Sequence, residues 1–338
     1  ILAVLGIVTM PWIASAMGAD GQLLTDSILY GCVVIIAIPA YILQCEFQCL
    51  FATAEKPKLG LYVAIMAGIT NIVLDALFIT VFKWGLVGAA LATAIGQYVG
   101  GIIPLLYFSR QNNSLLKFKK PKFDCDVLKK TVANGSSELM TNVSTSVVSM
   151  LYNAQLLKYA GEDGVASYGV LLYVALLFQA VFIGYSVGTA PIISYHYGAK
   201  NYDELKNLRK RSLIVIICFA VFMFIIGEFL SKPIAFIFVG YDNNLMEMTL
   251  RAFMIYSFSF LFSGFGVFGS SFFTALNDGL TSALIAFMRI LVFQVVSVLI
   301  FPIFWGVNGI WFSIVGAEIL ATIMTAFFII RKQKKYHY

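Results

Sequence analysis

The sequence predicts an all-α polytopic membrane protein, and its composition is the first observation behind this prediction. Hydrophobic residues make up 60% of the chain and charged residues only 12%, with a mean hydropathy of +0.88. Soluble domains carry about 25% charged residues, so most of this chain is suited to lipid. About ten runs reach the roughly 20 apolar residues that a membrane-spanning helix needs. They are too long for the strands of a membrane β-barrel.

An internal repeat is the second observation. Residues 51–57 open a hydrophobic run that ends at 84–88, and residues 273–279 open another that ends at 305–309. The openings lie 222 positions apart and the endings 221, so a single one-residue gap aligns the two copies. Two homologous halves within one membrane protein are typical of transporters.

The apolar runs give the expected spans in order. They lie near residues 1–16, 27–52, 59–82, 86–108, 129–159, 164–192, 211–238, 246–275, 279–304 and 307–330. Turn-forming residues separate several of them, at 18–21, 161–164, 240–244 and 277–279. The copies are the third and ninth spans, and an even shift makes them cross the membrane in the same direction. The two lobes are therefore expected to be parallel repeats.

The span count also predicts how the lobes are divided. A six-span half requires twelve spans, yet those at 129–159 and 164–192 have no partner in the first half. Because Ile1 begins inside an apolar run, we expect two N-terminal helices to be missing; a true ten-span protein is the alternative. The expected parts are a four-helix N-lobe, a cytoplasmic linker, a six-helix C-lobe and a basic cytoplasmic tail, at 1–108, 109–128, 129–330 and 331–338.

Basic residues set the expected orientation. Of the 23 Lys and Arg residues, 18 fall in alternate linkers or in the C-terminal tail, whereas the opposite turns are acidic or neutral. Cytoplasmic loops carry such an excess, so the long linker and the C-terminus are predicted to be cytoplasmic. The net charge of +6 thus reflects topology and gives no argument for a nucleic-acid partner.

The sequence gives little support for enzyme or metal chemistry. It has only two histidines, and its five cysteines form no CxxC pair, so we expect no metal site of the zinc type and no cofactor. It also lacks the P-loop, HExxH and GxSxG motifs. We therefore expect a protein that is not an enzyme.

Five segments together carry a more specific pattern: residues 54–58, 71–78, 85–93, 184–194 and 197–201. They resemble the multidrug and toxic compound extrusion (MATE) family of the MOP flippase and exporter superfamily, over essentially the whole chain. The resemblance implies two lobes of six helices around a central cleft. It also implies alternating access, by which cationic, lipophilic compounds leave in exchange for inward Na⁺ or H⁺. We expect a monomeric, multi-pass protein of a bacterial plasma (inner) membrane.

In the N-lobe, Asp75 is the clearest candidate for binding an ion or a substrate. A charged side chain inside a bilayer costs at least a few kcal/mol, and Asn71 lies on the same helix face, four residues earlier. Together they can hold a proton, Na⁺ or a substrate cation, and the resemblance implies this role; a hydrated carboxylate at the interface is the alternative. Gln48 is expected in the same N-lobe site, where its amide can bind cargo but cannot titrate. Glu46, on a different face, is a candidate for a gate or an ion pair.

In the C-lobe, Glu138 and Asn142 share one helix face. The resemblance implies an ion site at this Glu, with Na⁺ as one occupant, whereas a carboxylate that stabilises the helix N-terminus is the alternative. Arg289 falls in mid-span and needs an acidic partner, for which Glu318 and Glu138 are the candidates. We favour an ion pair or a gate there. Glu318 occupies the repeat position of Gln97, with a packing role as its alternative.

The charged residues are not duplicated between the two copies. Asp75 has Val296 or Ser297 opposite it in the repeat, and Arg289 has Ala67 or Gly68. This asymmetry is where we expect the coupling chemistry.

Three other functions remain as alternatives. A flippase for lipid-linked oligosaccharides, from the same superfamily, would need a basic cleft for pyrophosphate, for which Arg289 stands almost alone. A membrane-embedded enzyme would need nucleophile and base pairs, which are sparse. A scaffold would leave the carboxylates on several membrane helices without a purpose.

Overall fold

Two compact helical units make up the computed structural model, Ile1–Lys122 and Phe123–Tyr338. The structure describes residues 2–16, 21–110, 116 and 123–338. Every regular element in these ranges is a helix, which confirms the all-α prediction. The expected lobe boundaries at 108 and 129 stay a prediction.

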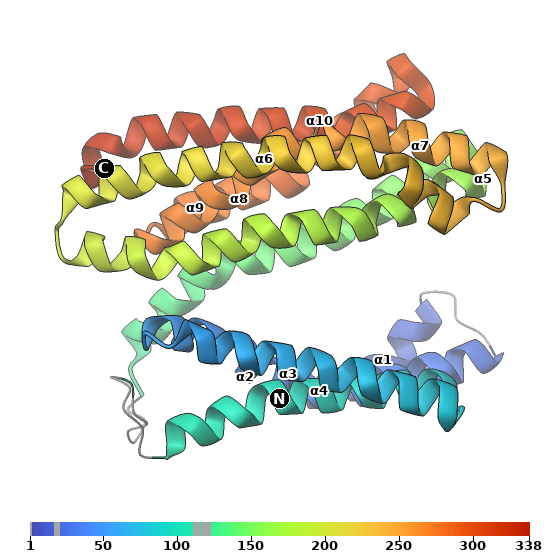
Figure 1. Ribbon diagram of the computed structural model, residues 1–338, viewed down its shortest axis with the longest axis horizontal. Coiled ribbons are helices and arrows are strands. Elements are labelled where there is room, and N and C mark those ends of the chain that lie inside the picture. Colours follow the sequence, from blue (N-terminus) through green and yellow to red (C-terminus); the bar gives the residue numbers. More distant parts are fainter. Residues whose placement is uncertain (1, 17–20, 111–115, 117–122) are drawn as a thin grey trace. The chain divides into compact units, whose positions relative to one another are not determined.

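The first unit is built around α4. Its elements are α1 (Leu2–Ala16), α2 (Gly21–Thr53), α3 (Pro57–Asp75), the π-helix η1 (Ala76–Val81) and α4 (Gly85–Ser109). Helices α2 and α3 both pack against α4 (Figure 1). Glycines on α4 make this approach close, because a Cβ atom on Gly101 would lie only 2.6 Å from the carbonyl oxygen of Ala40 on α2.

The second unit has α8 at its centre. Its elements are α5 (Cys125–Gly198), α6 (Tyr202–Val239), α7 (Asn243–Ser257), α8 (Phe260–Ala275), α9 (Gly279–Phe287), the π-helix η2 (Met288–Val292) and α10 (Phe293–Tyr336). Helix α8 packs against α5, α6, α9 and α10. It places Phe268, Phe272 and Phe273 in the main hydrophobic core, where their side chains are fully buried.

Glycines with left-handed backbone angles divide the two longest helices. Gly161 interrupts α5 with a φ of 66°, and Gly306 interrupts α10 with a φ of 56°. The apolar segment Leu139–Gly198 has 60 residues, and as one straight helix it would be roughly 90 Å long, about three times the bilayer core. Each of the apolar segments Leu139–Gly198 and Gly279–Tyr336 therefore comprises two consecutive spans. Gly161 lies in a predicted turn, and Gly306 lies between two predicted spans.

The membrane spans follow from these breaks. Among the described residues, six helices are long and apolar enough to cross a membrane, or seven if the bent pair α7–α8 is one span. With α5 and α10 each divided in two, and with the shorter apolar helix α1 included, the ten expected spans are present.

The backbone also confirms the internal repeat. Glu55 and Asn277 open the two copies with φ values of 59° and 60°, at positions 222 residues apart. Gly85 and Gly306 end the first span of each copy with φ values of 55° and 56°, at positions 221 residues apart. The left-handed region is uncommon for residues other than glycine, so its recurrence in this register indicates the same local fold in both copies.

Asn and Asp side chains in the turns start several of the helices. The side chains of Asp124, Asn201, Asp242 and Asp278 accept hydrogen bonds from the first backbone N–H groups of α5, α6, α7 and α9. Such N-caps typically contribute about 1 kcal/mol each. The polar turn residues of the sequence therefore fix where these helices begin.

Candidate functional site

Asp75 is the last residue of α3, directly before η1. Its Oδ1 atom is buried and has no hydrogen-bond partner. Asn71 lies one turn earlier on α3, where its Nδ2 is 3.5 Å from Thr93 Oγ1 of α4. A buried carboxylate oxygen without a donor is costly. It is therefore an acceptor available to a proton, Na⁺ or a cationic ligand.

The π-helix η1 follows Asp75 and leads into an aromatic cluster. The ring centroids of Phe78 and Trp84 are 5.0 Å apart, and those of Phe82 and Trp84 are 5.2 Å apart. π-helical turns are rare and are frequent at functional sites. Tryptophan is enriched at membrane–water interfaces, and aromatic rings attract lipophilic cations. The cluster thus puts Asp75 within a few turns of the interface, beside rings suited to such cations.

A second unpaired polar atom of this unit lies on α4. Gln97 Oε1 is buried without a hydrogen-bond partner. Helices α3 and α4 are close at the preceding residue, because a Cβ on Gly96 would lie 3.1 Å from both Ala67 O and Asn71 Cβ. The first copy of the repeat therefore has a neutral amide where the second copy has Glu318.

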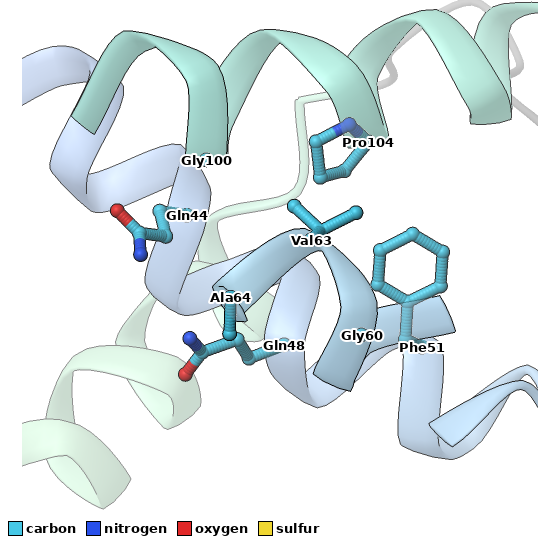
Figure 2. A pocket seen from close by; sticks show the side chains of 8 residues that line it. All are labelled: Gln44, Gln48, Phe51, Gly60, Val63, Ala64, Gly100 and Pro104. Atoms are coloured by element: carbon cyan, nitrogen blue, oxygen red, sulfur yellow. The ribbon is translucent and has the colours of Figure 1, made fainter. Parts of the chain in front are cut away.

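The predicted residue Gln48 lines a recess between α2, α3 and α4 (Figure 2). In that view the amides of Gln44 and Gln48 lie on one side and the rings of Phe51 and Pro104 on the other. The recess has no room for a water molecule, whereas ligand pockets span roughly 300–1,000 Å³. It is a seam between helices rather than a drug-sized cavity.

The structure does not bring Gln48 and Asp75 together. Gln48 lies at the level of Ala64 on α3, and Asp75 follows eleven residues later, which is about 16 Å along a helix. Glu46, also on α2, is exposed, and no ion pair involves it among the residues that the structure describes. The binding and gating roles of these side chains stay predictions.

In the second unit, Arg289 and Glu318 form a buried ion pair. Arg289 lies in η2 and Glu318 in α10, and their side chains are only 12% and 7% exposed. Arg289 Nε donates to Glu318 Oε1 and Oε2 at 3.2 and 3.0 Å, and Nη2 donates to Oε1 at 3.0 Å. Gly266 of α8 leaves space for the arginine, since a Cβ there would lie 2.6 Å from Arg289 Cδ. A gating role for this pair stays a prediction.

The predicted pair Glu138 and Asn142 lies on α5. The side chain of Glu138 falls outside the described part of the chain, and Asn142, one turn later, is exposed. Their role in an ion site therefore stays a prediction.

Two polar contacts of the second unit were not predicted as a site from the sequence. Tyr152 is fully buried, and its hydroxyl donates to Gln294 Oε1 at 2.6 Å and lies 2.8 Å from Ser313 Oγ. Ser257 Oγ donates to Glu228 Oε1 of α6. The isolated carboxylate in the apolar run 211–238 is the sequence signal that marks Glu228, whereas its partner lies 29 residues away in the chain.

Sequence comparison relates the chain to known exporters. It matches the MatE family over residues 1–77 and 139–300. It is 24% identical over 311 residues to the multidrug export protein MepA of Staphylococcus saprophyticus, covering 88% of this chain and 64% of that protein. It is also 24% identical over 339 residues to MepA of Staphylococcus haemolyticus, covering 96% of this chain and 72% of that protein. The chain thus spans about two thirds of these relatives.

Solved structures share the fold. A MATE crystal structure in complex with MaL6 superposes with a TM-score of 0.93 at 19% identity, covering 99% of this chain and 76% of that one. A MOP superfamily transporter from Pyrococcus furiosus gives a TM-score of 0.92 at 19% identity, covering 100% of this chain and 77% of that one. At these identities the likeness concerns the fold alone.

Proposed function

Since this chain belongs to the MatE family, we propose that it is a secondary active multidrug exporter of a bacterial membrane. It expels cationic, lipophilic compounds by alternating access, in exchange for Na⁺ or H⁺. Its similarity to the MepA multidrug export proteins supports the export of small molecules. The cytoplasmic side is the side of the C-terminus, as the distribution of basic residues indicates.

The observation that carries this proposal is the buried, unpaired Oδ1 of Asp75. A membrane carboxylate at an α-to-π junction, followed by aromatic rings, can exchange a cationic substrate for a proton or Na⁺. Asn71, on the same helix, supplies an amide oxygen to the same ligand. Exchange requires that the substrate and the coupling ion do not occupy the site at the same time. A single carboxylate meets this requirement, because the two cations compete for it.

Replacing Asp75 by Asn in the full-length protein tests the proposal. We expect the variant to be expressed normally but to give cells no resistance to cationic drugs. Asp163→Asn, which changes an exposed carboxylate in a turn of α5, is the matched control and should leave resistance intact. Full resistance of the Asp75 variant would refute the assignment. Transport in proteoliposomes, under separate Na⁺ and pH gradients, then identifies the coupling ion.

The flippase alternative is weakened by the ion pair of the second unit. A flippase for lipid-linked oligosaccharides needs free positive charge for pyrophosphate, and the charge of Arg289 is neutralised by Glu318. Vesicles that contain either a fluorescent cation or a fluorescent lipid-linked sugar separate the two functions. We expect transport of the cation only.

A further inference from the structure

Helix α6 comes very close to the break between α7 and α8. These two helices are bent by 50° relative to each other, and Ser257 is the last residue of α7. A Cβ atom on Gly227 of α6 would lie 3.2 Å from Ser257 Cβ, so the glycine allows the approach. The next residue, Glu228, accepts a hydrogen bond from Ser257 Oγ. A membrane carboxylate thus contacts the hinge of a broken span.

At the break, the backbone carbonyl of Met254 accepts a hydrogen bond from the side chain of Ser257. In a continuous helix the N–H of Phe258 would donate to Met254 O, but here it donates to Tyr256 O. Ser257 Oγ lies 2.9 Å from Met254 O, in addition to its contact with Glu228. A serine hydroxyl has only one hydrogen. Two acceptors, a carboxylate and a carbonyl, therefore compete for a single donor.

We infer that Glu228 binds a proton at this hinge and that the proton stabilises the bent form of the α7–α8 span. When a proton adds to the carboxylate, the new O–H donates to Ser257 Oγ, and the serine hydrogen turns to Met254 O. Each group then has a partner. When the proton leaves to water, the serine hydrogen returns to the carboxylate, and Met254 O loses its side-chain donor. No covalent bond other than the O–H bond forms or breaks.

The groups around Glu228 provide no counter-charge. After Ser257, the side chains nearest to the adjacent Gly227 are the rings of Phe178 of α5 and Phe253 of α7, each 3.7 Å from the position of its Cβ. On α5, the titratable residues whose rings pack against α6 are Tyr173, beside Phe238, and Tyr185, beside Phe219. Helix α8 has no titratable side chain. The titratable residues of α7 are Glu247 and Arg251, which are exposed, and Tyr256, which is partly buried; Lys232 of α6 itself is exposed. None of them forms an ion pair with Glu228 in the described ranges.

This inference rests on the proposed export for its purpose. An exporter driven by protons must link proton binding to an element with two arrangements. Broken spans form the substrate and ion sites of many transporters. The α7–α8 hinge with Glu228 meets this need in the second unit, whereas Asp75 lies in the first.

Two measurements that need no transport test the inference. The first is pH-difference infrared spectroscopy of the purified protein, which records the carbonyl band of protonated carboxyl groups. The second is the distance between spin labels on Asn244, in the first turn of α7, and Thr274, in the last turn of α8, in a background without the native cysteines. We expect Glu228→Gln to remove one titrating carboxyl band. We also expect it to hold the label distance at the low-pH value, because an amide N–H replaces the carboxyl O–H.

Glu247→Gln, which changes an exposed carboxylate on α7, is the matched control and should leave the label distance dependent on pH. If Glu228→Gln does not fold, Ser257→Ala serves instead and should abolish the pH dependence of the distance. A pH-dependent distance in the Glu228 variant, or a distance that responds to Na⁺ at constant pH, would overturn the inference. If both readouts behave as expected but the wild-type full-length protein exports no compound, the proposed exporter is refuted and the proton site at Glu228 still stands.

Discussion

Glu318 of α10 is bound by Arg289 of η2 through three hydrogen bonds of 3.0–3.2 Å, in a nearly solvent-free position. The residues at the same places in the first copy of the repeat are Gln97 and Ala67 or Gly68. The repeat thus holds an ion pair in one copy and an unpaired amide oxygen in the other. The same backbone fold therefore carries two opposite charges in the second unit and no charge at the matching positions of the first unit.

Removal of one partner of this ion pair is expected to be costly. Arg289→Met or Glu318→Leu alone leaves an uncompensated buried charge, which should lower the free energy of unfolding by about 3–5 kcal/mol. The double variant should be much closer to the wild type, because the apolar side chains fill a similar volume. Thermal unfolding in detergent measures all four proteins. Equal losses in the single and double variants would contradict this expectation.

The close approach at Gly266 predicts a site-specific effect of one methyl group. Gly266→Ala places a Cβ 2.6 Å from Arg289 Cδ, and overpacking of this kind costs about 1–3 kcal/mol. Gly184→Ala on α5 meets nothing within 4 Å, so it should be neutral or stabilising by up to about 1 kcal/mol. The comparison of the two melting temperatures tests the space that Gly266 provides. A Gly184→Ala variant that is destabilised as much as Gly266→Ala would show that the contact with Arg289 is not the cause of the loss.

Asp278 at the start of α9 predicts a loss of stability in acid. Burial raises the pKa of its carboxyl, but hydrogen bonds from Lys332, Tyr336 and Thr281 outweigh this and hold the pKa below its usual value of 3.8. Lys332 Nζ lies 2.7 Å and Tyr336 Oη 2.8 Å from Asp278 Oδ2. A pKa that is lowered by folding gives stability that is complete above the unfolded pKa and is lost as the pH falls through the folded pKa.

Asp278→Asn isolates this charge, because asparagine is also a good N-cap. We expect it to lower the free energy of unfolding by about 1–3 kcal/mol at neutral pH. The difference from the wild type should shrink below about pH 4. Asp242, the N-cap of α7, forms no ion pair among the described residues. Asp242→Asn should therefore lower the free energy of unfolding by less. Melting curves at several pH values measure both variants against the wild type. A difference for Asp278→Asn that stays constant down to pH 3 would show that the carboxylate charge does not stabilise the fold.

Removal of the Tyr152 hydroxyl is expected to lower stability even though the packing of the ring is kept. Tyr152→Phe keeps the packing but takes the hydroxyl donor from Gln294 Oε1, which lies 2.6 Å away in a part-buried site. Leaving a buried acceptor unpaired costs about 1–3 kcal/mol. Tyr173→Phe is the control, because this side chain is 65% exposed and the change should be within about 0.5 kcal/mol. Similar melting temperatures for both variants would rule out the network as a source of stability.

The candidate site was predictable where its residues are close in the chain or where a buried charge requires a partner. Asp75 and Asn71 are one helical turn apart, so their shared face follows from helical periodicity. Arg289 and Glu318 became a candidate pair because a buried charge requires a counter-charge. Glu228 and Ser257 were missed, because no local rule indicates which residue of α7 will face α6. Gln48 and Asp75 were expected in one site, although they lie at different levels of the helices.

The sequence by itself determined that this protein is a helical membrane protein with an internal repeat. Lipid permits only helices for runs of this length, and the left-handed residues at 55, 85, 277 and 306 follow from turn motifs that recur in both copies. Only the tertiary structure decided which polar atoms find partners. Helix packing brings Glu318 to Arg289 and Glu228 to Ser257, yet leaves Asp75 Oδ1 and Gln97 Oε1 without a donor. Partner choice depends on crossing and rotation of helices, which contacts distant in the chain determine.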